Sequence, residues 1–119
     1  MTYRVEVFAE AKADIAALPE RELQLAALRV VLDLRENPFL GEALRTRRRS
    51  SELVGCRRIA FDRPDYRGKP RYRLVYRNHP EDGSIEVVQV ISVGLRERLA
   101  AYKTAADRLR AEARRRRPI

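Results

Sequence analysis

The sequence predicts an α+β protein: a small, twisted, mostly antiparallel four-stranded sheet with an N-terminal helical hairpin and a C-terminal helix. Two stretches of helical periodicity meet at Pro19, near the N-terminus. Strand-like stretches then follow one another from residue 56 to residue 93, and helical periodicity returns after residue 96. Strands and helices that occur in separate runs are typical of a sheet with helices packed on it.

The N-terminal third is predicted to form one strand and two helices. Residues 3–8 alternate in part between apolar and polar side chains, which indicates a strand. Residues 9–18 have helical spacing, and Pro19 ends that helix but can occupy the first turn of the next. The second helix is expected over residues 20–36, before the stop at Pro38. Its apolar positions recur at helical spacing: Leu23, Ala27, Val30, Val31 and Leu34.

The rest of the chain is predicted to supply three strands and the last helix. Residues 39–51 are irregular. Residues 56–61 and 70–77 are strand candidates, and residues 85–93 are almost continuously apolar, as expected of a central strand buried on both faces. A helix is expected over residues 96–110 or beyond, with an apolar stripe formed by Leu99, Tyr102, Ala106 and Leu109.

The length and composition indicate one cytoplasmic domain. A chain of 119 residues is expected to form a single domain over residues 1–119, with a basic tail at about residues 111–119. No apolar run approaches the ~20 residues that span a bilayer, and no signal-peptide pattern opens the chain. The single cysteine, Cys56, excludes an internal disulfide and suits a reducing compartment. We therefore expect a cytoplasmic protein with no membrane contact.

The charge is high and consists mainly of arginine. Charged residues make up 36% of the chain and the net charge is +9. The guanidinium group offers a planar set of donors suited to phosphate, so this composition favours a nucleic-acid partner. An arginine-rich and alanine-rich chain is also what a GC-rich genome encodes. In either case the positive field attracts polyanions or an acidic protein.

Three arginines and one tyrosine are expected to converge at one face of the sheet. Strand alternation places Arg58 and Arg73 away from the apolar face of their strands. Arg96 follows the last strand, where Gly94 lets the backbone turn. Tyr102 lies less than two helical turns further along. We therefore treat Arg58, Arg73, Arg96 and Tyr102 as candidate catalytic residues.

Such a group suits one class of reaction. It holds no histidine, no pair of carboxylates and no metal-binding cluster, and arginine is a poor general base. Arginine does stabilise the charge that develops on a phosphate during transfer. A tyrosine among cations has its phenolate favoured, and it could help take the proton of a ribose 2′-hydroxyl. Attack of that hydroxyl on the adjacent phosphate would give a 2′,3′-cyclic phosphate without metal or cofactor, and only on RNA.

Two segments carry a resemblance to a known family. Residues 72–76 read YRLVY, and residues 90–98 read VISVGLRER and are followed by Tyr102. They resemble the RelE family of bacterial toxins, within the RelE/ParE superfamily of type II toxin–antitoxin systems. The likeness is close over residues 53–109 and looser over the helical hairpin. It implies a ribosome-dependent mRNA endoribonuclease that cuts in the ribosomal A site. The implied partners are the ribosome, mRNA and a cognate antitoxin, RelB-like or other.

The resemblance also assigns roles. Arg73 matches the family's arginine on the third strand, and Arg96 matches the arginine taken to stabilise or protonate the leaving oxygen. Tyr102 matches the tyrosine that stacks on or activates the substrate nucleotide. Arg58 falls where the family usually has a lysine. A second basic residue usually follows two positions later, where this chain has Ala60. Its loss would weaken stabilisation at the scissile phosphate.

Further arginines are candidate contacts to RNA or the ribosome: Arg47, Arg48, Arg49, Arg57, Arg71 and Arg77. The run 47–49 could equally be a solvated loop. Packing alone would explain Tyr102, and Arg73 or Arg96 taken singly could be ordinary surface arginines. Two other functions therefore stay open, a ParE-like gyrase inhibitor and a nucleic-acid-binding member of the superfamily without catalysis.

Overall fold

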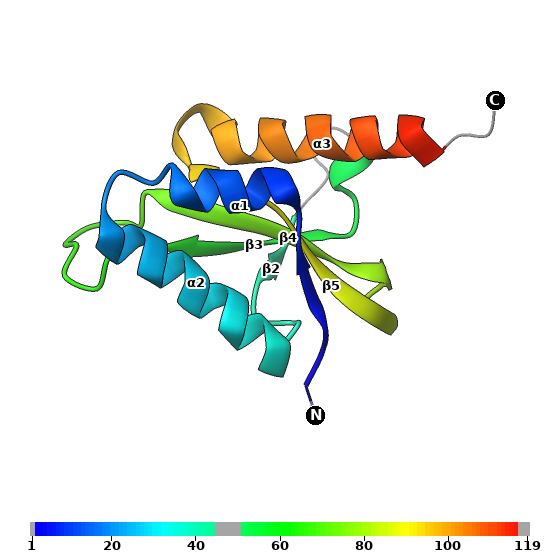
Figure 1. The fold of residues 1–119 in the computed structure, drawn as a ribbon, viewed down its shortest axis with the longest axis horizontal. Helices are drawn as coiled ribbons and strands as arrows, with labels where there is room; N and C mark the ends of the chain where they lie inside the picture. Colours follow the sequence, from blue (N-terminus) through cyan, green and yellow to red (C-terminus); the bar gives the residue numbers. More distant parts are fainter. Residues whose placement is uncertain (1, 45–50, 117–119) are drawn as a thin grey trace.

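The protein folds as a sheet with helices on both faces. The structure, a computed structural model, describes residues 2–44 and 51–116, except the side chains at positions 51 and 98. The strand order is β1-β5-β4-β3-β2 (Figure 1). The elements are β1 Val5–Val7, α1 Ala9–Ala16, α2 Arg21–Glu36, β2 Glu42–Ala43, a 3₁₀ turn Ser51–Leu53, β3 Cys56–Phe61, β4 Tyr72–Glu81, β5 Ser84–Leu95, a 3₁₀ turn Glu97–Leu99 and α3 Ala100–Arg116.

The predicted α+β class is confirmed, with one correction to the sheet. Strands β2 to β5 pair antiparallel, and β1 pairs with β5 in parallel. Over the described residues the sheet has five strands, one more than the sequence predicts. The additional strand is β2, which pairs only two residues with β3. A strand this short leaves no alternation in the sequence, because its position depends on the pairing partner.

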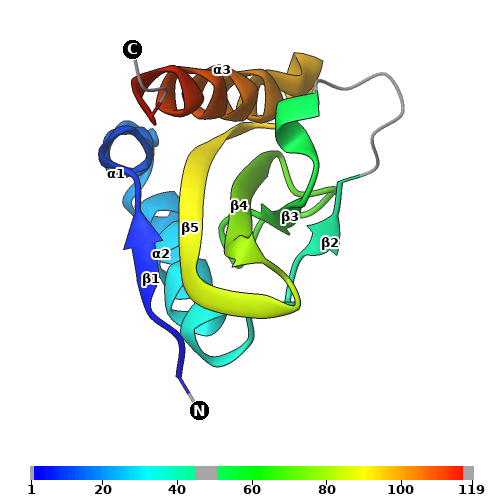
Figure 2. The same cartoon turned by 90° about the vertical axis from the view of Figure 1, so that its right-hand side faces the viewer.

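Each face of the sheet is covered by its own helical layer. Helices α1 and α2 pack on the face that presents Leu74 and Tyr76, and α3 packs on the face that presents Val75. Figure 2 shows α3 across one side of the strongly curved sheet and α1 and α2 on the other. The predicted alternation along β4 is confirmed, since Tyr72, Leu74 and Tyr76 share one core and Val75 belongs to the other.

A buried tyrosine fixes the path of the chain from α2 to β2. The hydroxyl of Tyr76 donates to the carbonyl of Pro38 at 2.8 Å and accepts from the backbone N–H of Gly41 at 2.9 Å. A Cβ atom at Gly41 would lie 2.7 Å from the Arg58 carbonyl oxygen, so this close approach requires glycine. These contacts place β2 against β3 and bring Glu42 opposite Arg58.

Polar contacts fix α3 on its face of the sheet. The guanidinium of Arg108 contacts both carboxylate oxygens of Asp14 in α1, at 2.6 and 3.0 Å, and donates to the carbonyl of Ile91. The Ser92 hydroxyl donates to the carbonyl of Ala101 at 2.8 Å. The last helix was expected from about residue 96, and a 3₁₀ turn occupies residues 97–99 before α3 begins. Within the described ranges no helix is both long and apolar enough to cross a membrane.

Candidate active site

The site is built on the ladder between β3 and β4. Ala60 lies opposite Arg73 in this ladder, and Arg58 lies opposite Val75. Because side chains two residues apart share a face, Arg58 and Ala60 lie on the same face as Arg73. The small Ala60 side chain leaves a hollow of about 230 Å³ between the two arginines. Its lining is formed by Leu40, Glu42, Arg58, Ile59, Ala60 and Arg73.

Arg58 joins this hollow to α3 and to β2. One nitrogen of its guanidinium donates to the Tyr102 hydroxyl at 3.4 Å, and another contacts the Glu42 carboxylate at 3.2 Å. The hydrogen bond to Tyr102 and, to a smaller extent, the one to Glu42 raise the pKa of Arg58. Arg58 therefore stays charged and holds one oxygen atom on either side.

Arg73 is buried, but no carboxylate compensates its charge within the described residues. It is 8% exposed. Its Nη1 donates to the carbonyls of Pro70 and Tyr72, both at 2.9 Å. These neutral acceptors hold the guanidinium in place without cancelling its charge. An oriented and uncancelled guanidinium suits an incoming phosphate.

The other two predicted catalytic residues lie differently. Tyr102 is 3% exposed, and its ring packs in the core under α3 while its hydroxyl meets Arg58. Both the packing role and the site role expected for Tyr102 are therefore compatible with its position. Arg96 is exposed at the end of β5 and does not line the hollow. Its backbone N–H donates to the Arg71 carbonyl at 2.8 Å, which links it to the start of β4.

The predicted RNA-contacting arginines fall into two groups. Arg47, Arg48 and Arg49 lie outside the described residues. The other three each bind a carboxylate of this chain: Arg57 with Asp82, Arg71 with Asp62, and Arg77 with Glu112. Their contact with RNA stays a prediction. In the structure they hold the β-hairpin, the β3–β4 loop and α3 in place.

Glu42 is the site residue that sequence reasoning missed. Among the described residues that line the hollow, it alone carries a carboxylate. A carboxylate within reach of a bound nucleotide can act as a general base. The sequence gives no signal for it, because Glu42 reaches Arg58 only through the two-residue strand β2.

Other reactive groups do not join this site. Within residues 2–44 and 51–116, no group of three or more histidine, cysteine, aspartate or glutamate side chains could hold a metal ion. Cys56 is buried, and burial raises the pKa of its thiol to about 11. The thiol therefore stays protonated at neutral pH and is a poor nucleophile.

Comparison with known proteins identifies the family. The model for the ParE toxin of type II toxin–antitoxin system, parDE, matches residues 5–100, which is most of the chain. The chain belongs to this family of toxins. It is thus a type II toxin of the RelE/ParE superfamily, as the resemblance predicted. No curated protein matches the toxin in sequence.

Solved structures of RelE toxins share the fold. A double mutant of the Escherichia coli toxin RelE in the free state is 26% identical to this chain, with a TM-score of 0.60. The match covers 91% of this chain and 98% of the RelE chain. The isolated E. coli RelE toxin is 25% identical, with a TM-score of 0.56 over 90% and 98%. A chain of the Mycobacterium tuberculosis toxin–antitoxin complex RelBE2 is 28% identical to this chain, with a TM-score of 0.55. The match covers 81% of this chain and 100% of the RelBE2 chain.

Proposed function

We propose that the toxin is a ribosome-dependent mRNA endoribonuclease that cuts in the A site and inhibits translation in the cytoplasm. The observation that carries this proposal is the hollow between Arg58 and Arg73, with Tyr102 and Glu42 beside it. The hollow is lined by two cations and the Glu42 carboxylate, and the Tyr102 hydroxyl lies against Arg58 behind it. The likeness to RelE toxins supports it independently.

The proposed reaction uses the RNA's own nucleophile. The ribose 2′-hydroxyl forms a bond to the adjacent phosphorus, and the bond from phosphorus to the 5′-oxygen of the next nucleotide breaks. The products are a 2′,3′-cyclic phosphate and a new 5′-hydroxyl. Arg73 and Arg58 stabilise the charge on the phosphate, and Arg96 stabilises the leaving 5′-oxygen, which takes its proton from water. The hydroxyl proton passes to an oxygen beside Arg58, either on the Glu42 carboxylate or on Tyr102 in its phenolate form.

The position of Ala60 implies a slower enzyme than one with a cation there. Ala60 contributes no charge to the hollow that it lines. Arg57 and Arg71 do not supply the missing charge, because each is paired with a carboxylate, Asp82 and Asp62 respectively. We therefore propose that transition-state stabilisation rests on Arg58, Arg73 and Arg96.

Induction of the toxin in a bacterial host, followed by primer extension on abundant mRNAs, tests this function. The native toxin should produce cuts within codons, and Arg73→Ala should abolish them. Arg29→Ala is a matched control, because Arg29 is an exposed arginine on α2, across the sheet from the hollow. Growth arrest with intact mRNA would contradict the proposal.

A second function, inhibition of DNA gyrase, is favoured by a different observation. A family model of the ParE toxin matches residues 5–100 of the toxin. Since the superfamily shares one fold, the fold does not choose between the two activities. Gyrase-linked DNA breaks with intact mRNA would support the ParE-like activity. RNA binding without cuts or breaks would indicate a member that binds nucleic acid without catalysis.

We also propose a cognate antitoxin that covers the hollow and α2. One structural relative was crystallised as a toxin–antitoxin complex. Leu25, Leu28 and Leu32 form a stripe of half-exposed leucines along α2, which suits the apolar face of an amphipathic segment. The net charge of +9 favours an acidic one. Since Tyr102 and Arg73 are both buried, such a partner would mask the more exposed Arg58 and Glu42 at the mouth of the hollow.

A further inference from the structure

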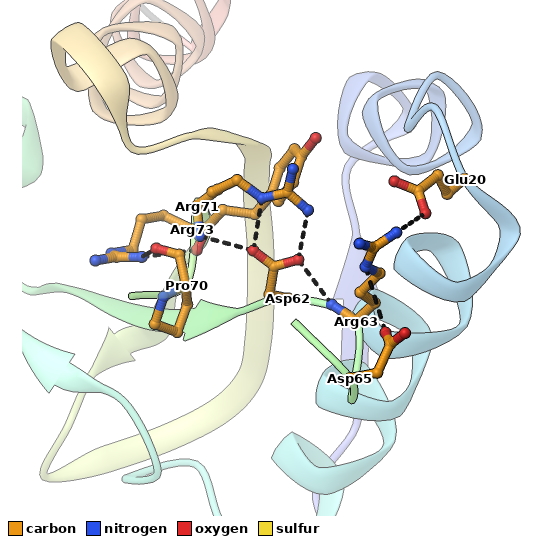
Figure 3. A network of polar contacts seen from close by, with 8 residues as sticks. Glu20, Asp62, Arg63, Asp65, Pro70, Arg71 and Arg73 are labelled. Carbon is orange, nitrogen blue, oxygen red and sulfur yellow. Dashed lines mark hydrogen bonds and ion pairs between the residues drawn. The ribbon is translucent and has the colours of Figure 1, made fainter. Parts of the chain in front are cut away.

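The loop between β3 and β4 is closed by a single carboxylate. Asp62 follows β3 directly, and its side chain is 5% exposed. It accepts four hydrogen bonds: from the backbone N–H groups of Arg63 and Arg71, both at 2.9 Å, and from the Arg71 guanidinium at 2.8 and 2.9 Å. Figure 3 shows this carboxylate between the two ends of the loop.

Arg71 is held on several sides by this arrangement. Its guanidinium binds Asp62 through two nitrogens, which is the strong bidentate form of the pair. It also lies over the Tyr66 ring, 4.0 Å from the centroid, and 5.6 Å from that of Tyr72. The bonds to Arg71, first of all those of its side chain, lower the pKa of Asp62 to about 2. Both partners are therefore charged throughout the neutral range.

The backbone beside Arg71 holds two of the proposed catalytic arginines. The carbonyl of Pro70, one residue before Arg71, accepts from the Arg73 guanidinium at 2.9 Å. The carbonyl of Arg71 itself accepts from the backbone N–H of Arg96 at 2.8 Å. A shift of Arg71 would therefore move one acceptor of the Arg73 side chain and the anchor of the Arg96 backbone together.

We propose that Asp62 and Arg71 form a positioning pair that aligns Arg73 and Arg96 for the reacting phosphate. This inference rests on the proposed endoribonuclease function and adds two residues that act through Arg73 and Arg96 rather than on the reacting phosphate. Asp62 cancels the charge of Arg71, so Arg71 does not compete with Arg73 for the phosphate. Arg73, bound only to carbonyls, keeps its charge for the substrate.

A second branch of the same loop provides the control. Arg63 pairs with Glu20 in the connection before α2 at 2.7 Å and with Asp65 at 3.3 Å. Asp65 is an exposed carboxylate of this loop, and no described contact joins it to Arg71 or Arg73. Asp65→Asn therefore removes a loop carboxylate without touching the proposed pair.

The test compares Asp62→Asn, Arg71→Lys and Asp65→Asn in cleavage of mRNA on programmed ribosomes. Asn at position 62 cannot accept all four hydrogen bonds, and Lys at position 71 loses the bidentate geometry. We expect both to lower kcat, by up to about 100-fold, with a much smaller change in KM. Asp65→Asn should cleave like the native toxin. Thermal unfolding confirms that each variant is folded. If Asp62→Asn does not fold, the kcat of Arg71→Lys tests the positioning role instead.

A double-mutant cycle separates positioning from general damage. If Asp62 acts through Arg73, then Asp62→Asn should cost much less kcat in an Arg73→Lys background than in the native toxin. Equal losses in the two backgrounds, or a loss only in KM, would overturn the proposal.

Amide hydrogen exchange makes the inference testable apart from activity. The Arg96 amide should exchange faster in Asp62→Asn than in Asp65→Asn, because its acceptor is the Arg71 carbonyl. If the native toxin leaves ribosome-bound mRNA intact, the proposed function fails, and the exchange rate of Arg96 still decides the positioning. Unchanged exchange would overturn the positioning itself.

Discussion

Ala60 and Arg73 lie directly opposite each other in the ladder between β3 and β4. A methyl group thus lies beside a buried guanidinium, at the point where the sequence resemblance to RelE toxins predicts a second cation. The space that remains is the hollow between Arg58 and Arg73. On the proposed function, this pair defines both the candidate site and its weakness, because the hollow would receive the phosphate with one fewer charge to stabilise it.

Ala60→Lys should therefore make the toxin faster. A lysine at this position would extend over the hollow beside Arg73 and add a positive charge near the scissile phosphate. We expect kcat on ribosome-bound mRNA to rise on the order of tenfold. Ala60→Met has similar length without the charge and is the control. An equal gain from both substitutions would show that filling the hollow, rather than charge, matters.

Glu42→Gln and Tyr102→Phe should distinguish the two proton acceptors beside Arg58. A carboxylate is a ready proton acceptor at neutral pH, whereas a phenol is not. We expect Glu42→Gln to lower kcat about 100-fold and Tyr102→Phe to lower it less. The measurement is single-turnover cleavage at neutral pH. The opposite ranking would make Tyr102 the acceptor and leave Glu42 as a partner of Arg58 only.

The stability of the toxin should fall in acid partly through Asp62. Its pKa is lowered from an ordinary value of 3.8 to about 2 in the folded chain. A carboxyl whose pKa is lower in the folded state stabilises the fold above the unfolded pKa and loses that contribution as the pH falls. The free energy of unfolding should therefore decrease between pH 4 and pH 2 more steeply in the native toxin than in Asp62→Asn. Denaturant titrations across this range would show parallel curves if Asp62 contributed nothing.

Leu28→Glu should weaken binding of the antitoxin. Leu28 lies in the middle of the exposed leucine stripe on α2, and a charge there would have to be buried against an apolar partner surface. We expect affinity for the co-expressed antitoxin to fall by at least about tenfold. Val54→Glu, at an exposed apolar residue before β3, is the control. Loss of binding in the control but not in Leu28→Glu would place the partner elsewhere.

Much of the fold could be predicted from sequence because its signals are local. The alternation of Tyr72, Leu74 and Tyr76 against Arg73 is set by the period of a strand, and the structure follows it. The short strand that contains Glu42 could not be predicted, since only its partner strand gives it a register. Site residues that depend on such long-range pairing cannot be predicted from local sequence either.

Charge partners are the part of the site that the sequence conceals. Arg71 directly precedes β4 and Arg73 lies on it, and by composition the two arginines are equivalent. In the structure Asp62 neutralises Arg71, whereas Arg73 meets only carbonyl groups. The contact between Asp62 and Arg71, which are nine residues apart, decides which arginine keeps its charge for a substrate. No local sequence pattern encodes this contact.

We propose above that Arg58, Arg73 and Arg96 promote attack by an RNA 2′-hydroxyl in the ribosomal A site. The most direct measurement follows cleavage of mRNA on programmed ribosomes by the native toxin and by Arg73→Ala. The mRNA carries either ribose or a single 2′-deoxyribose on the 5′ side of the cut. We predict a 2′,3′-cyclic phosphate product from the all-ribose mRNA with the native toxin only, and no cut at the deoxyribose. Intact mRNA with the native toxin, or a cut that survives the deoxyribose or Arg73→Ala, would contradict it.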